Sequence, residues 1–223
     1  FSGACSDPQC GVQIEQADQK RFIVPDGFSV GFYSQPNNDI ARQTYIPVPD
    51  PWIHAQDELR AFPNPEFGLY RAGENGLVFH YSEGEHQNGY ALCMNCGYAD
   101  SMTVDNELPD EFSQHNKLRG KAGQNNGSVC NPAAHQIKRN RYLGYSNSTD
   151  IFELYLKRGS TGEFLTVNTD NRKLCWTLGI ALRYGLSVSL GINSEEIGVA
   201  VKRAKIPQAP GKTVFAICLY DKT

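Results

Sequence analysis

The chain has 223 residues, 40% of them hydrophobic and 20% charged, which is the composition of an ordinary globular protein with a hydrophobic core. Its formal net charge of −3 excludes a general electrostatic attraction to nucleic acid or acidic membranes, so any such contact needs a local basic patch. No apolar stretch is long enough for a membrane-spanning helix and no signal peptide opens the chain, which predicts a cytoplasmic protein without a membrane partner.

The first part of the chain is expected to be irregular and rich in strands. Prolines recur from Pro25 to Pro65 and would interrupt any long helix. Residues 19–24 and 77–81 have the apolar, β-branched and aromatic content of strands. Residues 109–131 are polar and rich in Gly and Asn, which indicates an exposed loop.

The last part of the chain shows firmer patterns. Residues 174–184 place Leu174, Leu178, Ala181 and Leu182 at helical spacing, which predicts a buried helix. A short helix is the alternative around residues 194–196. Strands are predicted at residues 149–156, 186–190, 197–201 and 214–220, the last of them central in its sheet. The fold class expected is α+β: a mixed sheet with few helices, loop-rich, with a zinc-knuckle insertion.

The cysteines divide by their neighbours. Cys175 and Cys218 lie in apolar runs, which favours buried and inert thiols. The other five lie beside Gly, Asn, Asp or Pro, in turn-like sequence. An odd total of seven also argues against a simple disulfide framework. Turns that carry cysteines are where metal knuckles form.

The strongest motif is the C-x2-C turn of Cys93 and Cys96, followed by Gly97. Zinc prefers four thiolate or imidazole ligands, and such a turn supplies two of them. A redox dithiol is the alternative, but that motif normally opens a helix, whereas a polar loop follows here. Cys130 is the expected third ligand because it lies in another turn. For the fourth we leave two candidates open, His115 and His135.

The N-terminus carries a further cysteine pair. Cys5 and Cys10 form either half of a second zinc site or a free or disulfide-linked pair. The chain begins at Phe1 without Met and ends directly after an apolar run, so we expect it to be a fragment of a longer polypeptide.

No catalytic centre is predicted. Gly211, Lys212 and Thr213 resemble the end of a phosphate-binding loop, but the required earlier glycine is Ile206. Two basic clusters are candidates for nucleic-acid binding, with a solvated charged face as the alternative. Their members are Lys138, Arg139 and Arg141 with Tyr142, and Lys202 with Arg203.

Four segments, in order, resemble a known family. They are residues 23–28 (IVPDGF), 89–97 (GYALCMNCG), 143–154 (LGYSNSTDIFEL) and 217–221 (ICLYD). Together they are similar to the cysteine-bearing C-terminal domain of unknown function of superfamily 2 DNA helicases, also present in the DISARM phage-defence protein DrmB and in helicases of the Druantia system and of mitomycin repair. The family has four metal-binding cysteines, whereas only three are well placed here. It also continues into a Gly-rich turn that this chain lacks.

We expect two regions. Residues 1–20 are the end of an upstream segment that carries the candidate second zinc half-site, and the resemblance implies a helicase-associated zinc-binding domain, truncated at its C-terminus, at residues 21–223. The resemblance also implies a zinc-stabilised accessory module of an ATP-dependent helicase complex in bacterial anti-phage defence or DNA repair, supporting DNA binding or docking to a helicase partner. Two alternatives are a metal-dependent nuclease or hydrolase and a pure protein-interaction scaffold.

Overall fold

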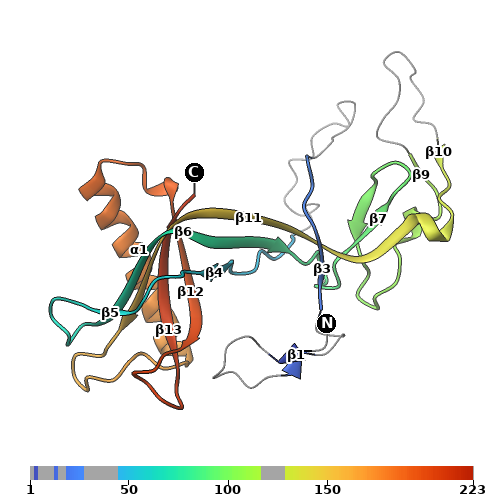
Figure 1. The fold of residues 1–223 in the computed structure, drawn as a ribbon. Helices are drawn as coiled ribbons and strands as arrows, with labels where there is room; N and C mark the ends of the chain where they lie inside the picture. The colour runs from blue at the N-terminus through green and yellow to red at the C-terminus, as the bar shows by residue number, and fades with distance from the viewer. Residues whose placement is uncertain (1–2, 5–12, 15–18, 28–44, 117–128, 223) are drawn as a thin grey trace. The chain divides into compact units, whose positions relative to one another are not determined.

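The computed structural model describes residues 3–4, 13–14, 19–27, 45–116 and 129–222 (Figure 1). The chain forms two compact units, and each combines segments that are distant in sequence. Unit 1 contains residues 1–49 and 81–145, and unit 2 contains residues 50–80 and 146–223. Cys5 and Cys10 lie outside the described residues.

Unit 2 is built on a largely antiparallel sheet in the order β12-β13-β11-β6-β4, with β5 also pairing with β6. Two of its strands are long and also contribute residues to unit 1. The bounds are β4 Trp52–His54, β5 Arg60–Ala61, β6 Gly68–Ser82, β11 Ile137–Leu156, β12 Ile197–Lys205 and β13 Thr213–Asp221.

Strand β11 is buried on both faces in unit 2, because apolar side chains cover each side of it. Ile151 and Tyr155 belong to a core that also contains Ile53 and Cys218. Leu154 belongs to a second core, against the helix side. Strand β13 is likewise buried from Val214 to Tyr220, which confirms the predicted central strand.

The helix of unit 2, α1 (Thr169–Leu190), packs on β12 and β13 (Figure 1). The side chain of Asn168 caps its start by accepting a hydrogen bond from Asn171 N, and Gly191 ends it in a left-handed conformation. Two predictions fail here. The helix includes residues 186–190, which are not a strand, and most of its side chains are exposed, so it is not a buried helix.

A buried ion pair lies inside unit 2. Glu153 on β11 is fully buried, and the ammonium group of Lys202 on β12 bonds to its carboxylate. Lys202 also donates to the backbone oxygen of Ile53 at 3.0 Å, and Tyr155 donates its hydroxyl to Glu153 at 2.8 Å. The amine of Lys202 therefore has a structural role, which the sequence did not indicate.

Unit 1 has its own part of the sheet, in which β3 and β7 flank the first half of β11 and β8 pairs with β7. Strand β3 runs parallel to β11, and β7 antiparallel. Short pairs and 3-10 turns complete the unit. The bounds are β1 Gly3–Ala4, β2 Gln13–Ile14, β3 Arg21–Ile23, β7 Tyr90–Cys93, β8 Ala99–Ser101, η3 Asp110–Phe112, β9 His115–Asn116, β10 Val129–Cys130 and η4 Ala134–Gln136.

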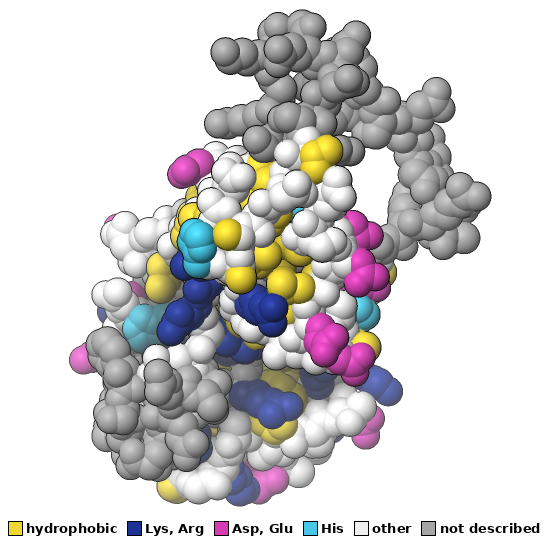
Figure 2. All heavy atoms as spheres, turned by 90° about the vertical axis from the view of Figure 1, so that its right-hand side faces the viewer, with side chains coloured by type: hydrophobic (Ala, Val, Ile, Leu, Met, Phe, Trp, Pro, Cys, Tyr) yellow, Lys and Arg dark blue, Asp and Glu magenta, His cyan; other side chains and the backbone are white. Residues whose placement is uncertain are grey.

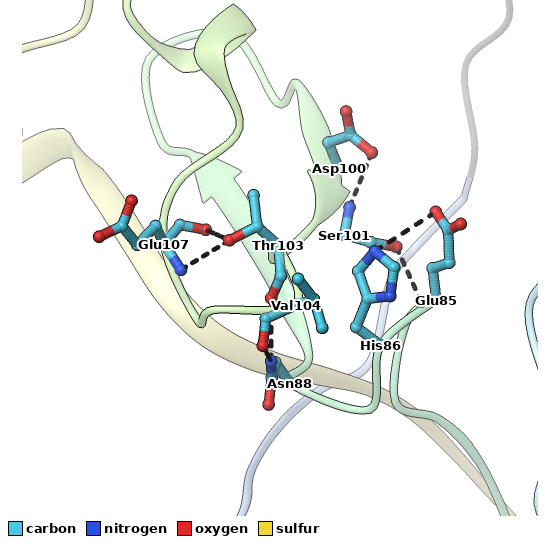
Figure 3. Close-up of polar contacts among 8 residues, drawn as sticks. All are labelled: Glu85, His86, Asn88, Asp100, Ser101, Thr103, Val104 and Glu107. Atoms are coloured by element: carbon cyan, nitrogen blue, oxygen red, sulfur yellow. Dashed lines mark hydrogen bonds and ion pairs between the residues drawn. The ribbon is translucent and has the colours of Figure 1, made fainter.

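The register between β7 and β11 shifts at a bulge, where Asn140 has a φ of 52°. Hydrogen bonds hold this irregular backbone. The side-chain amide of Asn140 donates to the backbone oxygen of Asn88. The side-chain amide of Asn88 donates in turn to the backbone oxygens of Thr103 and Val104 at 2.9 and 3.2 Å (Figure 3). The bulge is therefore tied to the loop that follows β8.

The predicted α+β class is confirmed: strands dominate, and α1 is the one α-helix among the described residues. The strands predicted at 77–81, 149–156, 197–201 and 214–220 all lie within longer observed strands, and β3 lies within 19–24. The alternative short helix is η5 Ser194–Glu196. Within the described part of the chain, no helix has the length and apolar character needed to cross a membrane.

Candidate metal centre

The C-x2-C motif forms the turn between β7 and β8. Cys93 is the last residue of β7, and its backbone N–H donates to Tyr98 O at 2.8 Å while its carbonyl accepts from Gly97 N at 2.8 Å. Gly97 has a φ of +83°, a conformation that L side chains rarely adopt. The glycine therefore lets the chain reverse so that the Cys93 and Cys96 sulfurs lie close together.

The remaining donors come from a second strand pair. His115 on β9 and Cys130 on β10 are direct cross-strand partners in an antiparallel pair. Cross-strand partners carry their side chains on the same face of the pair. The register alone therefore places an imidazole next to a thiol, although the two residues are distant in sequence.

The four donor atoms of Cys93, Cys96, His115 and Cys130 all lie within 4.8 Å of one another, and this is the one such group among the described residues. The sulfurs of Cys93 and Cys130 are 3.8 Å apart, which is about the edge of a tetrahedron with zinc–sulfur bonds of about 2.3 Å. The Cys96 sulfur and His115 Nε2 are 3.0 Å apart, a hydrogen-bond distance. These four residues can hold a metal ion.

The tautomer of His115 is set by its second ring nitrogen. Nδ1 lies 3.1 Å from the backbone oxygen of Glu111, and a carbonyl oxygen only accepts, so Nδ1 carries the proton. Nε2 then presents its lone pair toward the cysteines. A ligand histidine whose other nitrogen donates to a backbone carbonyl is the usual arrangement around protein-bound metals.

Two neighbouring side chains contact the donor groups. The amide of Asn95 donates to the Cys130 sulfur at 3.3 Å, and the ring of Tyr98 stacks on His115 with centroids 4.5 Å apart. A small apolar core surrounds the group, in which Ala91, Met102 and Phe112 are buried. The site is therefore closed by side chains that fix the geometry of its donors.

The thiols of the C-x2-C motif have opposite pKa shifts. Burial acts to raise the pKa of Cys93, but hydrogen bonds from the backbone N–H groups of Asn95 and Cys96 and from nearby thiols outweigh it, so the pKa is lowered. Burial and the neighbouring sulfurs of Cys93 and Cys130 raise the pKa of Cys96 to about 11. A thiolate next to two further sulfurs is costly without a cation, which a metal ion would supply.

The structure thus brings together the three cysteines expected as ligands and, of the two histidine candidates, His115. His135 is exposed on η4 and is not part of the group. Cys175 and Cys218 are buried in the cores of unit 2, as predicted. The roles of Glu111 O, Asn95 and Tyr98 had no signal in the sequence, because each depends on the folded backbone.

The basic residues predicted as nucleic-acid-binding candidates differ in their exposure and contacts. Lys138 and Arg139 are exposed and Arg141 is partly buried on β11, whereas the Tyr142 ring packs against Phe22, with Lys20 over it at 4.9 Å. Arg203 is exposed on β12, and the neighbouring Lys202 amine is engaged by Glu153. Lys and Arg side chains (dark blue) are visible on the face shown in Figure 2.

Comparison of the chain with protein-family models, with curated proteins and with solved structures finds no significant match.

Proposed function

We propose that the group of Cys93, Cys96, His115 and Cys130 binds zinc as a structural ion. The observation that carries this proposal is the convergence of four protein donors, three of them sulfurs, in a buried site. Four protein ligands complete the tetrahedron that structural zinc prefers, whereas catalytic zinc keeps a position open for water. The donor set therefore favours a structural ion over the nuclease or hydrolase alternative.

The ion would join the β7–β8 turn to the β9–β10 pair. Each of these pairs is short, and a short hairpin alone is marginally stable in water. The core around the donors is also small. Zinc binding would then supply much of the free energy that orders this part of unit 1.

Metal content per chain tests this proposal. Wild-type protein and the His135→Ala variant should carry one zinc ion per site, whereas Cys93→Ser and His115→Ala should lose most of it. His135→Ala is the matched control because His135 is an exposed histidine close to Cys130 in sequence. Zinc retention by His115→Ala together with loss by His135→Ala would contradict the assignment of the fourth ligand.

For the whole chain we propose an accessory module of an ATP-dependent DNA helicase complex, in bacterial anti-phage defence or DNA repair. The support is the ordered set of segments that resemble the helicase-associated domain. Three of these segments lie in β7 with its turn, in β11 and in β13. The contact to DNA would be made by the basic side chains of β11, Lys138, Arg139 and Arg141. Such backbone contacts weaken as salt rises.

Charge reversal tests the DNA role. The triple variant Lys138→Glu, Arg139→Glu, Arg141→Glu should bind DNA more weakly than wild type, with a smaller dependence of affinity on salt. If DNA affinity is unchanged, the DNA role is wrong and docking to a helicase partner is the role that is left. Docking is measured as retention of a helicase by the immobilised chain. Cleavage of labelled DNA by the purified, metal-loaded chain would instead support the nuclease alternative.

A further inference from the structure

Two arginines lie directly opposite each other in the sheet of unit 1. Arg21 on β3 and Arg141 on β11 are register partners in the parallel pair, so their side chains share one face. Phe22 and Tyr142, the next partners, lie on the other face, where their rings are 5.9 Å apart. The contact between these two rings therefore agrees with the register, which places both arginine side chains on the opposite face.

The bulge at Asn140 adds a third cation to this face. Lys138 and Arg141 are three residues apart, an odd spacing that would place them on opposite faces of a regular strand. Across the bulge, however, they pair with Leu92 and Tyr90, which are two residues apart on β7 and share a face. The extra residue of the bulge therefore brings Lys138 to the same face as Arg141 and Arg21.

These three cations lack acidic partners within the described part of the chain, where neither an ion pair nor a side-chain hydrogen bond involves any of them. The nearby carboxylate of Glu83 is bonded to Lys20, which lies over the Tyr142 ring on the opposite face. Like charges directly opposite each other in a sheet destabilise it. An anion between the two guanidinium groups would reverse that effect.

We propose that Arg21 and Arg141 form a pair that holds one phosphate of a nucleic-acid backbone, with Lys138 as the next contact along β11. The guanidinium fork matches the geometry of a phosphate and donates two hydrogen bonds to it. This inference rests on the proposed DNA role and adds Arg21, from a separate strand, to it. Because Tyr142 lies on the other face, the contact reads backbone charge and not base identity.

The test uses the zinc-loaded chain and a fluorescent thymidine oligonucleotide, with anisotropy measured over a salt series. Arg21→Gln should weaken binding severalfold and reduce the slope of log affinity against log salt by about 0.7, the value for one single-strand phosphate contact. Lys173→Gln, which removes an exposed cation from α1, is the matched control and should leave the slope unchanged. The Arg21→Gln, Arg141→Gln double variant should lose no more slope than either single variant, because both side chains hold one phosphate.

A second measurement needs no oligonucleotide. Without ligand at low salt, Arg21→Gln should unfold at a higher temperature than wild type, because a repulsion is removed. Inorganic phosphate, compared with chloride at equal ionic strength, should raise the unfolding temperature of wild type more than that of Arg21→Gln.

The outcomes separate the two proposals. If wild type binds no oligonucleotide but phosphate stabilises it through Arg21, the proposed DNA role is wrong. The pair of Arg21 and Arg141 is then a site for free phosphate. If wild type binds the oligonucleotide and Arg21→Gln behaves like Lys173→Gln in both measurements, Arg21 and Arg141 do not form a phosphate site, whereas the DNA role is supported. If the slope of log affinity against log salt falls twice as much in the double variant as in either single variant, the two arginines contact separate phosphates and the proposal of one shared phosphate is wrong.

Discussion

Replacing Lys202 with Met should destabilise unit 2 strongly, although the position lies in a basic cluster that the sequence offers as a candidate for nucleic-acid binding or as a solvated charged face. The Lys202 side chain is 23% exposed, but its ammonium group neutralises Glu153, whose side chain is fully buried. Lys202→Met keeps the aliphatic stem and removes only the charge. The Glu153 carboxylate then keeps one hydrogen-bond partner among the described residues, the Tyr155 hydroxyl.

The expected magnitude follows from this burial. Removing one partner of a buried ion pair costs about 3–5 kcal/mol, because the other charge remains uncompensated in the interior. The double variant Glu153→Leu, Lys202→Met removes both charges and should recover most of that loss. The free energy of unfolding of this double variant should stay about 1–2 kcal/mol below that of wild type, because the buried Tyr155 hydroxyl loses its acceptor.

Urea unfolding followed by tryptophan fluorescence is a suitable assay, because both tryptophans, Trp52 and Trp176, belong to unit 2. Saturating zinc keeps the metal centre constant between variants. A loss below about 1 kcal/mol for Lys202→Met, or a double variant as unstable as the single one, would refute this reasoning. A stable Lys202→Met protein with weakened DNA binding would instead restore Lys202 as a nucleic-acid contact.

Two further predictions concern the cysteines and their turn. Burial raises the pKa of Cys175 to about 11 and of Cys218 to about 12, so both thiols should resist alkylation at neutral pH in the folded protein, with or without a chelator, and should react after unfolding in urea. Peptide mass mapping identifies the labelled sites. Rapid labelling of either thiol in the native state would contradict their burial. Gly97→Ala should weaken zinc binding, because its left-handed backbone costs a non-glycine residue roughly 1 kcal/mol or more, and a competition titration with a zinc chelator that gave equal affinities would show that this turn tolerates the strain.

The sequence predicted the part of the metal centre that is local in the chain. The spacing of Cys93 and Cys96 and the following Gly97 carry their own turn chemistry, and the structure has that turn. The choice between His115 and His135 was open because it depends on the pairing of β9 with β10, which no local pattern encodes. A histidine close to a cysteine in sequence is therefore a weaker guide than a histidine opposite it in a strand pair.

The errors in α1 and the omission of Arg21 have different physical reasons. The alternation of Leu186, Val188 and Leu190 is typical of a strand, yet the caps at Asn168 and Gly191 enclose these residues in one helix. The buried residues of α1 are Asn171, Cys175 and Gly179. Of the leucines that set the predicted period, Leu178 is partly buried against the core, whereas Leu174 and Leu182 are exposed. Arg21 has no basic neighbours other than Lys20 in sequence, and only the register with β11 makes it part of a charged face.

The discontinuous make-up of the two units affects the order in which the chain folds. Strands β6 and β11 are neighbours in the sheet of unit 2, but residues 81–145, which belong to unit 1 and hold the four donor residues, lie between these parts of the strands in sequence. During synthesis, every metal ligand emerges before the end of β11. A zinc ion bound at that stage would act as a clip that shortens the loop to be closed, and each halving of its effective length lowers the entropic cost of pairing β6 with β11 by about 0.6 kcal/mol.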